Sequence, residues 1–200
     1  ITLALSDTIA ENVIAMMHRF REEGTLISFD VNYRASLWSE EKARETILSV
    51  LPMVDFFFVS EESSRRMFGM TGTHEEIQEQ FAKKYPNLRM IASTKRKVIT
   101  STRQSFNSLV YDCESGEHFM DAPYDNIDVV DRIGSGDAYV AGALYGALKY
   151  GDIHSAARYG DAMASVKNTV IGDMTEVDIV DIDRVIKNHT TTGPKSEMVR

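Results

Sequence analysis

The apolar run Val54–Val59, Val-Asp-Phe-Phe-Phe-Val, constrains the fold of this 200-residue chain more than any other segment. A strand of this composition is buried on both faces, which favours a parallel sheet covered by helices over an alternating antiparallel sheet. Helical patterns precede and follow it. Because strands that alternate with helices form right-handed βαβ units, we predict an α/β layered domain with a mostly parallel sheet.

Capping residues and apolar spacing predict the other elements. Asp7 is the expected cap of the first helix, and Thr73 with Glu76 is expected to form a capping box. The alternating, turn-rich sequence over residues 98–121 predicts antiparallel strands. The remaining expected strands cover residues 25–30 and 88–93, and the expected helices cover residues 8–23, 39–51, 60–69, 73–84, 136–149, 153–169 and 181–189.

Composition restricts the class of protein. With 43% apolar residues the chain can bury a core, and we expect one domain over residues 1–190 with a loose tail over 191–200. The net charge of −8 argues against nucleic-acid binding, which depends on phosphate neutralisation. The apolar stretch 51–60 is far shorter than the roughly 20 residues that a membrane span needs. A single cysteine, Cys113, suits a reducing compartment, so we expect a cytoplasmic protein without nucleic-acid or membrane partners.

The sharpest motif is Gly134-Ser135-Gly136-Asp137, which directly precedes an apolar helix. Its glycines allow a tight turn and close approach of a ligand, and the amides at a helix N-terminus bind anions. An acid beside such a site repels a stored phosphate, but it can accept the proton of a hydroxyl that attacks phosphorus. From spacing alone, a loop with an N-capping aspartate is an equally good interpretation. The motif is neither a dinucleotide-binding fingerprint nor a Walker A loop.

A second polar cluster, Asp30, Asn32 and Arg34, follows a predicted strand. Its i, i+2, i+4 spacing in an extended segment would project all three side chains to one side. The guanidinium suits carboxylate or phosphate oxygens. Without further context, an ion pair between Asp30 and Arg34 at the strand end is the favoured interpretation.

Residues 131–137 (Asp-x-x-Gly-x-Gly-Asp), followed by Ala-Tyr-Val-Ala-Gly, resemble the second signature of the ribokinase-like (PfkB) carbohydrate kinases. Residues 30–38 (Asp-x-Asn-x-Arg-x-x-Leu-Trp) resemble the 2-keto-3-deoxygluconate kinase branch of that family. The resemblance implies a three-layer α/β/α sandwich of which this chain is the C-terminal part, with the N-terminal part and a β-sheet lid missing. It also implies transfer of phosphate from ATP, with Mg²⁺, to a sugar acid. Since the family's lid often mediates dimerisation, a homodimer of the full-length protein is expected.

The resemblance also implies roles for individual residues. Asp137 is the expected catalytic base, with Gly134, Ser135 and Gly136 as the anion hole. Arg34 is expected to face the carboxylate of the sugar acid, and Asp173 to contact its hydroxyls, although Asp173 is equally well interpreted as a turn residue. The expected nucleotide-binding residues are Asn32, Tyr33, Arg34, Ser93, Thr94, Lys95, Arg96, Gly134, Gly136 and Asn168. A solvated basic turn is an equally good interpretation of residues 95–97.

The metal site is the weakest part of the resemblance. Ser60 and Ser63 stand where the family has the asparagine and glutamate of a motif associated with Mg²⁺ and phosphate. Glu61 or Glu62 is a candidate substitute, but a capped helix with an acidic first turn is the favoured interpretation. Alternative functions are a fructokinase- or ribokinase-type sugar or nucleoside kinase, and a non-catalytic nucleotide-binding module.

Overall fold

The computed structural model describes residues 1–190, and the expected tail 191–200 lies outside the described residues. The chain divides into two compact units. Unit 1 comprises Ile1–Lys95 and Leu109–Phe119, and unit 2 comprises Arg96–Ser108 and the chain from Met120 onward. The expectation of one kinase core over residues 1–190 stays a prediction, and each unit is described by itself below.

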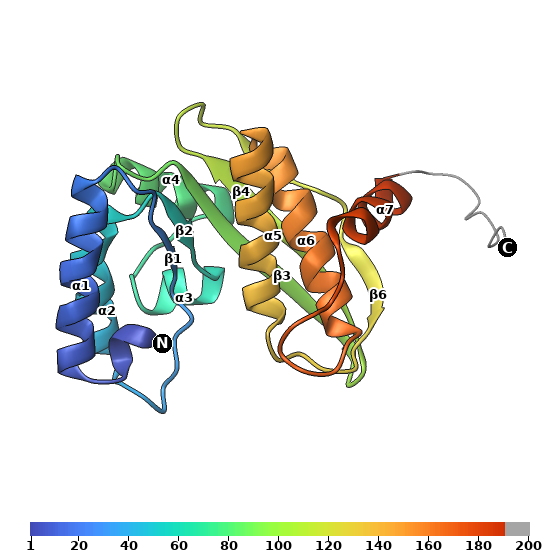
Figure 1. Cartoon of the computed structure of the whole chain (residues 1–200), viewed down its shortest axis with the longest axis horizontal. Coiled ribbons are helices and arrows are strands. Elements are labelled where there is room, and N and C mark those ends of the chain that lie inside the picture. Colours follow the sequence, from blue (N-terminus) through green and yellow to red (C-terminus); the bar gives the residue numbers. More distant parts are fainter. Residues whose placement is uncertain (191–200) are drawn as a thin grey trace, which may run out of the picture. The chain divides into compact units, whose positions relative to one another are not determined.

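The elements along the chain are shown in Figure 1. The helices are α1 (Asp7–Glu22), α2 (Glu40–Val50), α3 (Glu61–Arg66), α4 (His74–Lys84), α5 (Ser135–Tyr150), α6 (Ile153–Asn168) and α7 (Ile179–Thr190), with short 3₁₀ helices at Thr2–Ala4 and Leu51–Met53. The strands are β1 (Ser28–Asp30), β2 (Phe56–Phe58), β3 (Met90–Thr100), β4 (Arg103–Asp112), β5 (His118–Met120) and β6 (Tyr124–Asp128).

The sheet is mixed, and its strand order is β1-β2-β3-β4-β5, with β6 paired to β4. Strand β2 is parallel to both of its neighbours, with Phe57 opposite Phe29 in β1 and opposite Ile91 in β3. All three residues of β2 are buried, as the apolar run predicts. Strands β4 and β6 are antiparallel. The predicted α/β class is therefore confirmed.

Unit 1 packs helices against the parallel strands around a core that includes Phe57, Phe81 and Ile47. The single acid of the apolar run, Asp55, is fully buried just before β2. Its carboxylate accepts hydrogen bonds from Arg21 at 2.9 Å and from the backbone N–H of Ile27 at 2.9 Å. A buried carboxylate is tolerated only when it is paired and hydrogen-bonded. Asp55 thus connects the last turn of α1, through Arg21, and the residue before β1, Ile27, to the start of strand β2.

In unit 2, helices α5 and α6 lie side by side (Figure 1), and glycines permit their close approach. A Cβ atom at Gly142 would collide with the backbone of Tyr159, and one at Gly146 with the backbone of Ser155. Helix α5 is bounded by Gly134 and Gly151, both with φ of 75°. The close packing holds the N-terminus of α5, which carries the glycine motif, at a defined place in the unit.

Several boundaries differ from the sequence-based predictions. Ser6 rather than Asp7 caps α1, because the Ser6 hydroxyl accepts a hydrogen bond from the N–H of Ile9. Strand β1 starts only at Ser28, since the N–H of Thr25 still bonds to Phe20 and closes the end of the helix. The sequence reasoning also missed β6 and ended β3 too early. Strand β3 continues to residue 100 because it pairs with its sheet neighbour β4.

The buried Asp161 of α6 makes the stability of unit 2 depend on pH. Its Oδ2 accepts a hydrogen bond from the N–H of Ser108 at 3.3 Å, whereas Oδ1 has no partner among the described residues. Burial is the main cause that raises the pKa of Asp161 from 3.8 to about 7. Between about pH 4 and pH 7 the folded protein therefore holds a proton that the unfolded chain has released, so the free energy of unfolding falls as pH rises through this window.

We expect Asp161→Asn, which keeps a neutral side chain of the same shape, to remove this pH dependence. The variant should be more stable than the wild type at pH 8, by at most about 4 kcal/mol for a shift of roughly three pKa units, and nearly equal to it at pH 4. Thermal unfolding across this pH range measures both quantities. An identical pH slope in the two proteins would refute the role of Asp161.

Candidate active site

The glycine motif forms the N-terminus of α5 in the geometry of an anion site. Gly134 occupies the N-cap position, where no side chain caps the helix. The N–H of Ser135 donates to the carbonyl of Arg132 at 3.2 Å, so this amide is used within the turn. The N–H groups of Gly136 and Asp137 follow in the first turn, where a helix supplies no internal partner. These two amides are therefore the donors that an anionic ligand would meet.

Asp137 is the acid of this first turn, and its side chain is exposed. The interpretation of Asp137 as the N-capping residue is wrong, because Gly134 holds that position. A carboxylate in the first turn of the helix, beside uncapped amides, can meet a hydroxyl of a molecule bound there. The role of Asp137 as the catalytic base stays a prediction.

Asp131, three residues before Gly134, holds the glycine turn through hydrogen bonds of its carboxylate. The sequence analysis did not assign this role. The Oδ1 of Asp131 accepts a hydrogen bond from the N–H of Ile133 at 3.0 Å, and its Oδ2 from the N–H of Gly172 at 3.0 Å. These backbone bonds hold the pKa of Asp131 below its ordinary value. Asp131 thereby joins the glycine turn to a loop that comes 41 residues later in the sequence.

That later loop also carries Asp173, an exposed residue whose backbone lies against Gly134. A Cβ atom at Gly134 would overlap with the Asp173 carbonyl. Unit 2 thus places the Asp173 residue next to the turn, as a substrate-contacting role requires. The role itself stays a prediction.

Asn168, predicted to reach the base of the nucleotide, is fully buried. Its side-chain amide donates to the carbonyl of Ala164 at 2.7 Å. The backbone carbonyl of Asn168 accepts hydrogen bonds from the N–H groups of Val130 at 2.8 Å and Asp131 at 3.3 Å. This placement favours a structural role, in which the end of α6 holds the segment that leads into the glycine turn.

The second cluster lies in unit 1, at the end of β1. Asn32 has a φ of 34°, and its N–H donates to Oδ1 of Asp30 at 3.3 Å. The segment is therefore turned rather than extended, which contradicts the expected projection of Asp30, Asn32 and Arg34 to one side. Arg34 is exposed and donates to the carbonyl of Tyr33 at 3.1 Å, so its guanidinium can still meet a ligand. The half-buried Tyr33 packs inward through a hydrogen bond to the carbonyl of Trp38.

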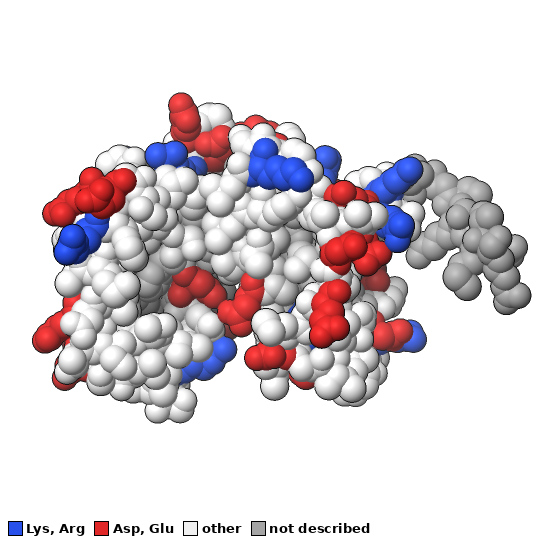
Figure 2. Space-filling model, in the orientation of Figure 1, with Lys and Arg blue, Asp and Glu red and all other residues white. Residues whose placement is uncertain are grey.

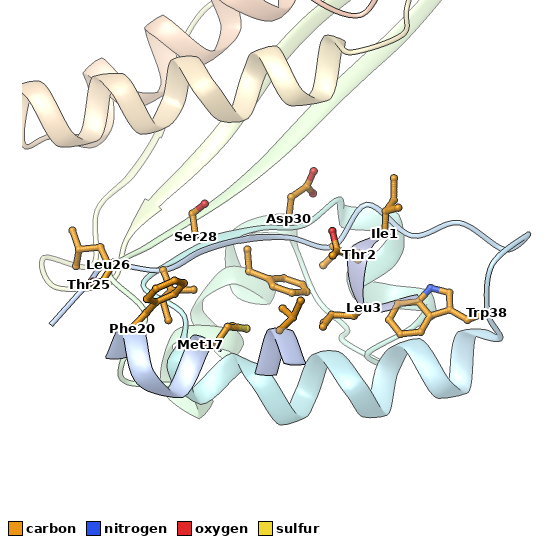
Figure 3. A pocket seen from close by; sticks show the side chains of 14 residues that line it. Ile1, Thr2, Leu3, Met17, Phe20, Thr25, Leu26, Ser28, Asp30 and Trp38 are labelled. Carbon is orange, nitrogen blue, oxygen red and sulfur yellow. The ribbon is translucent and has the colours of Figure 1, made fainter. Parts of the chain in front are cut away.

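A cavity of about 490 Å³ lies in unit 1 beside β1 (Figure 3). Leu3, Met17 and Trp38 line its helix side, while Ser28 and Asp30 lie on the opposite side of the strand. Most of the residues that line the cavity are apolar, and Thr2, Thr25, Ser28 and Asp30 are its polar members. We assign no ligand to this cavity.

The expected nucleotide loop at residues 93–96 is part of strand β3 instead. Ser93 is buried, and its hydroxyl accepts a hydrogen bond from the side chain of Gln78 at 3.3 Å. Thr94 is half-buried, and Lys95 and Arg96 are exposed. Successive side chains of a strand point to opposite faces. A basic turn at residues 95–97 is thus wrong, because these residues belong to strand β3. The nucleotide-binding role of residues 93–96 stays a prediction.

The two candidate metal ligands are paired with arginines. Glu61 accepts a hydrogen bond from Arg65 at 2.7 Å, which is the main cause that lowers the pKa of Glu61, and Glu62 pairs with Arg66 at 3.1 Å. Ser60 caps α3 through the N–H of Ser63, so the interpretation as a capped helix with an acidic first turn is confirmed. Within residues 1–190, no three His, Cys, Asp or Glu side chains gather to hold a metal ion. Both glutamates are thus engaged by arginines, and an indirect role for either of them toward Mg²⁺ stays a prediction.

Acidic and basic side chains are interspersed on the face shown in Figure 2. In the part of the chain that the structure describes, no helix is long and apolar enough to cross a membrane.

An uncapped helix N-terminus can bind a phosphate, and an acid beside it can accept the proton of an attacking hydroxyl, so the site can serve phosphoryl transfer. The chain matches the pfkB family carbohydrate kinases over residues 3–179 and belongs to that family. It is 30% identical over 187 residues to a 2-dehydro-3-deoxygalactonokinase of Haloferax volcanii, covering 94% of this chain and 55% of the relative. The predicted family and its ribokinase-like fold are thereby confirmed.

Solved structures agree with this assignment. A PfkB family carbohydrate kinase from Listeria grayi has a TM-score of 0.87 at 30% identity, with 93% of this chain and 57% of that chain covered. A 2-dehydro-3-deoxygluconokinase from Thermotoga maritima has a TM-score of 0.81 at 27% identity, with 90% and 54% covered. The chain thus spans little more than half the length of these relatives.

Proposed function

We propose that the whole protein is an ATP-dependent carbohydrate kinase that phosphorylates a sugar acid of the 2-keto-3-deoxygluconate type to its 6-phosphate. The observation that carries the proposal is the uncapped N-terminus of α5 with Asp137 in its first turn. Kinases named for 2-dehydro-3-deoxy sugar acids among the relatives support the substrate class.

In this proposal the residues of unit 2 act on the reacting groups in two ways. Asp137 accepts the proton of the sugar hydroxyl. The hydroxyl oxygen forms a bond to the γ-phosphorus of ATP, and the bond between that phosphorus and the ADP oxygen breaks. The N–H groups of Gly136 and Asp137 stabilise the charge on the phosphoryl oxygens. Mg²⁺ bound to ATP would neutralise phosphate charge, and we assign no residue to it because Glu61 and Glu62 are paired with arginines.

Arg34 is proposed to recognise the carboxylate of the sugar acid, and its replacement tests this role. Because loss of a charge-assisted hydrogen bond costs about 1.5–3 kcal/mol, Arg34→Ala should raise KM for the sugar acid by about 10- to 100-fold and leave KM for ATP nearly unchanged. Steady-state kinetics with each substrate varied in turn measures both values. Arg44→Ala, at an exposed position of α2, is the control. Equal effects on both substrates would remove Arg34 from the sugar site.

The overall activity is tested by ADP release from the intact protein with a panel of substrates. We expect the highest kcat/KM with 2-keto-3-deoxy sugar acids and a much lower value with fructose, ribose and nucleosides. A preference for a neutral sugar or a nucleoside would select the alternative kinase function. ATP binding without ADP release for any substrate would select a nucleotide-binding module. We also propose a cytoplasmic homodimer, which fractionation and light scattering of the intact protein would check.

A further inference from the structure

Lys167, in the last turn of α6, is fully buried. Its Nζ donates to two backbone carbonyls, that of Val170 at 2.9 Å and that of Asp131 at 3.3 Å. Lysine is almost never fully buried unless its polar head finds partners, because removing it from water is costly. This head is satisfied by main-chain carbonyls of two separate segments.

Both segments lead to the proposed catalytic turn. Asp131 lies three residues before the glycine motif, and its carboxylate accepts a hydrogen bond from the N–H of Ile133, the residue directly before that motif. Val170 begins the loop in which the N–H of Gly172 binds the same carboxylate and the backbone of Asp173 lies against Gly134. The Lys167 head therefore lies at the point where the turn and its supporting loop meet.

We propose that Lys167 is a positioning residue for phosphoryl transfer. Its Nζ binds the carbonyls of both Asp131 and Val170, and these two hydrogen bonds hold the turn from Gly134 to Asp137 in place against the loop that supports it. This inference rests on the proposed catalytic role of that turn. Lys167 itself does not touch the reacting groups, since its donors are directed to the two carbonyls. Its effect on rate comes through geometry, to which in-line transfer is sensitive.

A purely local role is the competing explanation, since a lysine near a helix C-terminus often satisfies the last carbonyls. The bond to Val170 alone is of this kind, because it spans only three residues. The bond to Asp131 spans 36 residues and serves no helix end. A local role predicts lower stability of α6 without a specific effect on the turn.

The test is Lys167→Met in the intact protein, which keeps most of the side-chain volume and removes the donors. The control is Lys149→Met, on the exposed surface of α5. We expect Lys167→Met to lower kcat by about 10- to 100-fold, with KM for the sugar within about twofold, and ammonium chloride to restore part of kcat where sodium chloride does not. A loss of kcat no larger than in the control, or a loss explained by the unfolded fraction in thermal denaturation, would overturn the proposal.

Hydrogen exchange gives a second readout that does not need activity. The hydrogen-bonded amides of Ile133, Ser135 and Gly172 should exchange faster in Lys167→Met, while those in the middle of α5 and α6 should stay protected. Exchange that increases evenly along α6 and leaves the turn unchanged would overturn the positioning role. If the wild type shows no kinase activity, the proposed function fails, and the exchange pattern still decides whether Lys167 holds the turn.

Discussion

Replacing Asp137 by asparagine is expected to lower kcat of the intact protein by about 10²–10⁴-fold, the range that general-base catalysis contributes. Asparagine keeps the size of the side chain but cannot accept the hydroxyl proton. Because the amides of Gly136 and Asp137 belong to the main chain, ATP affinity should stay within a few-fold. Coupled ADP release measures kcat, and calorimetric titration with ATP measures binding.

The matched control is Asp125→Asn, a neutralised exposed aspartate on β6 of the same unit. It should leave kcat unchanged, which excludes a general effect of net charge. If Asp137→Asn kept more than a tenth of wild-type turnover, Asp137 would not be the base, and the anion turn would need another proton acceptor.

Gly134→Ala is expected to have the second-largest effect, for two independent structural reasons. The φ of 75° at Gly134 lies in the left-handed region, where a residue with a Cβ atom is disfavoured by roughly 1–2 kcal/mol. The added methyl group would also overlap with the carbonyl of Asp173. The turn must shift to relieve this overlap, and a displacement of about 1 Å is enough to cost about 100-fold in rate.

Gly136→Ala is the control, because it adds a methyl group to the same turn without the left-handed φ and the overlap that affect Gly134. Apart from the adjacent residues and the nearby backbone of the helix itself, no heavy atom lies within 4 Å of a Cβ built at Gly136, so the fold can accept alanine there. In thermal unfolding, Gly134→Ala should be clearly destabilised, and Gly136→Ala should remain close to the wild type. Equal melting temperatures for Gly134→Ala and the wild type would show that the supporting loop is not held against the turn.

Local sequence signals predicted many of the helices correctly. Thr73 and Glu76 form the expected capping box of α4, and Gly151 ends α5. These features depend on residues within a few positions of each other, so they can be interpreted without knowledge of the fold. The buried strand β2 was predictable for a related reason, since its consecutive phenylalanines have no polar face to expose.

The candidate site was predictable only as a motif. The sequence shows Gly134, Gly136 and Asp137 next to an apolar helix, and the structure places them at its uncapped N-terminus. Sequence reasoning was wrong where backbone conformation or sheet pairing overrides local pattern. Asn32 adopts a left-handed conformation that breaks the expected extended segment, and β3 runs through Lys95 because it is paired in the sheet.

The sequence by itself therefore determined the α/β class and the place of the glycine motif before an apolar helix, because both follow from short-range pattern and residue type. Only the tertiary structure decided how that motif is held. The bonds from Gly172 to Asp131 and from Lys167 to Asp131 join residues 41 and 36 positions apart. No local preference encodes such contacts, since they exist only after α5 and α6 pack together and bring the two loops to one place.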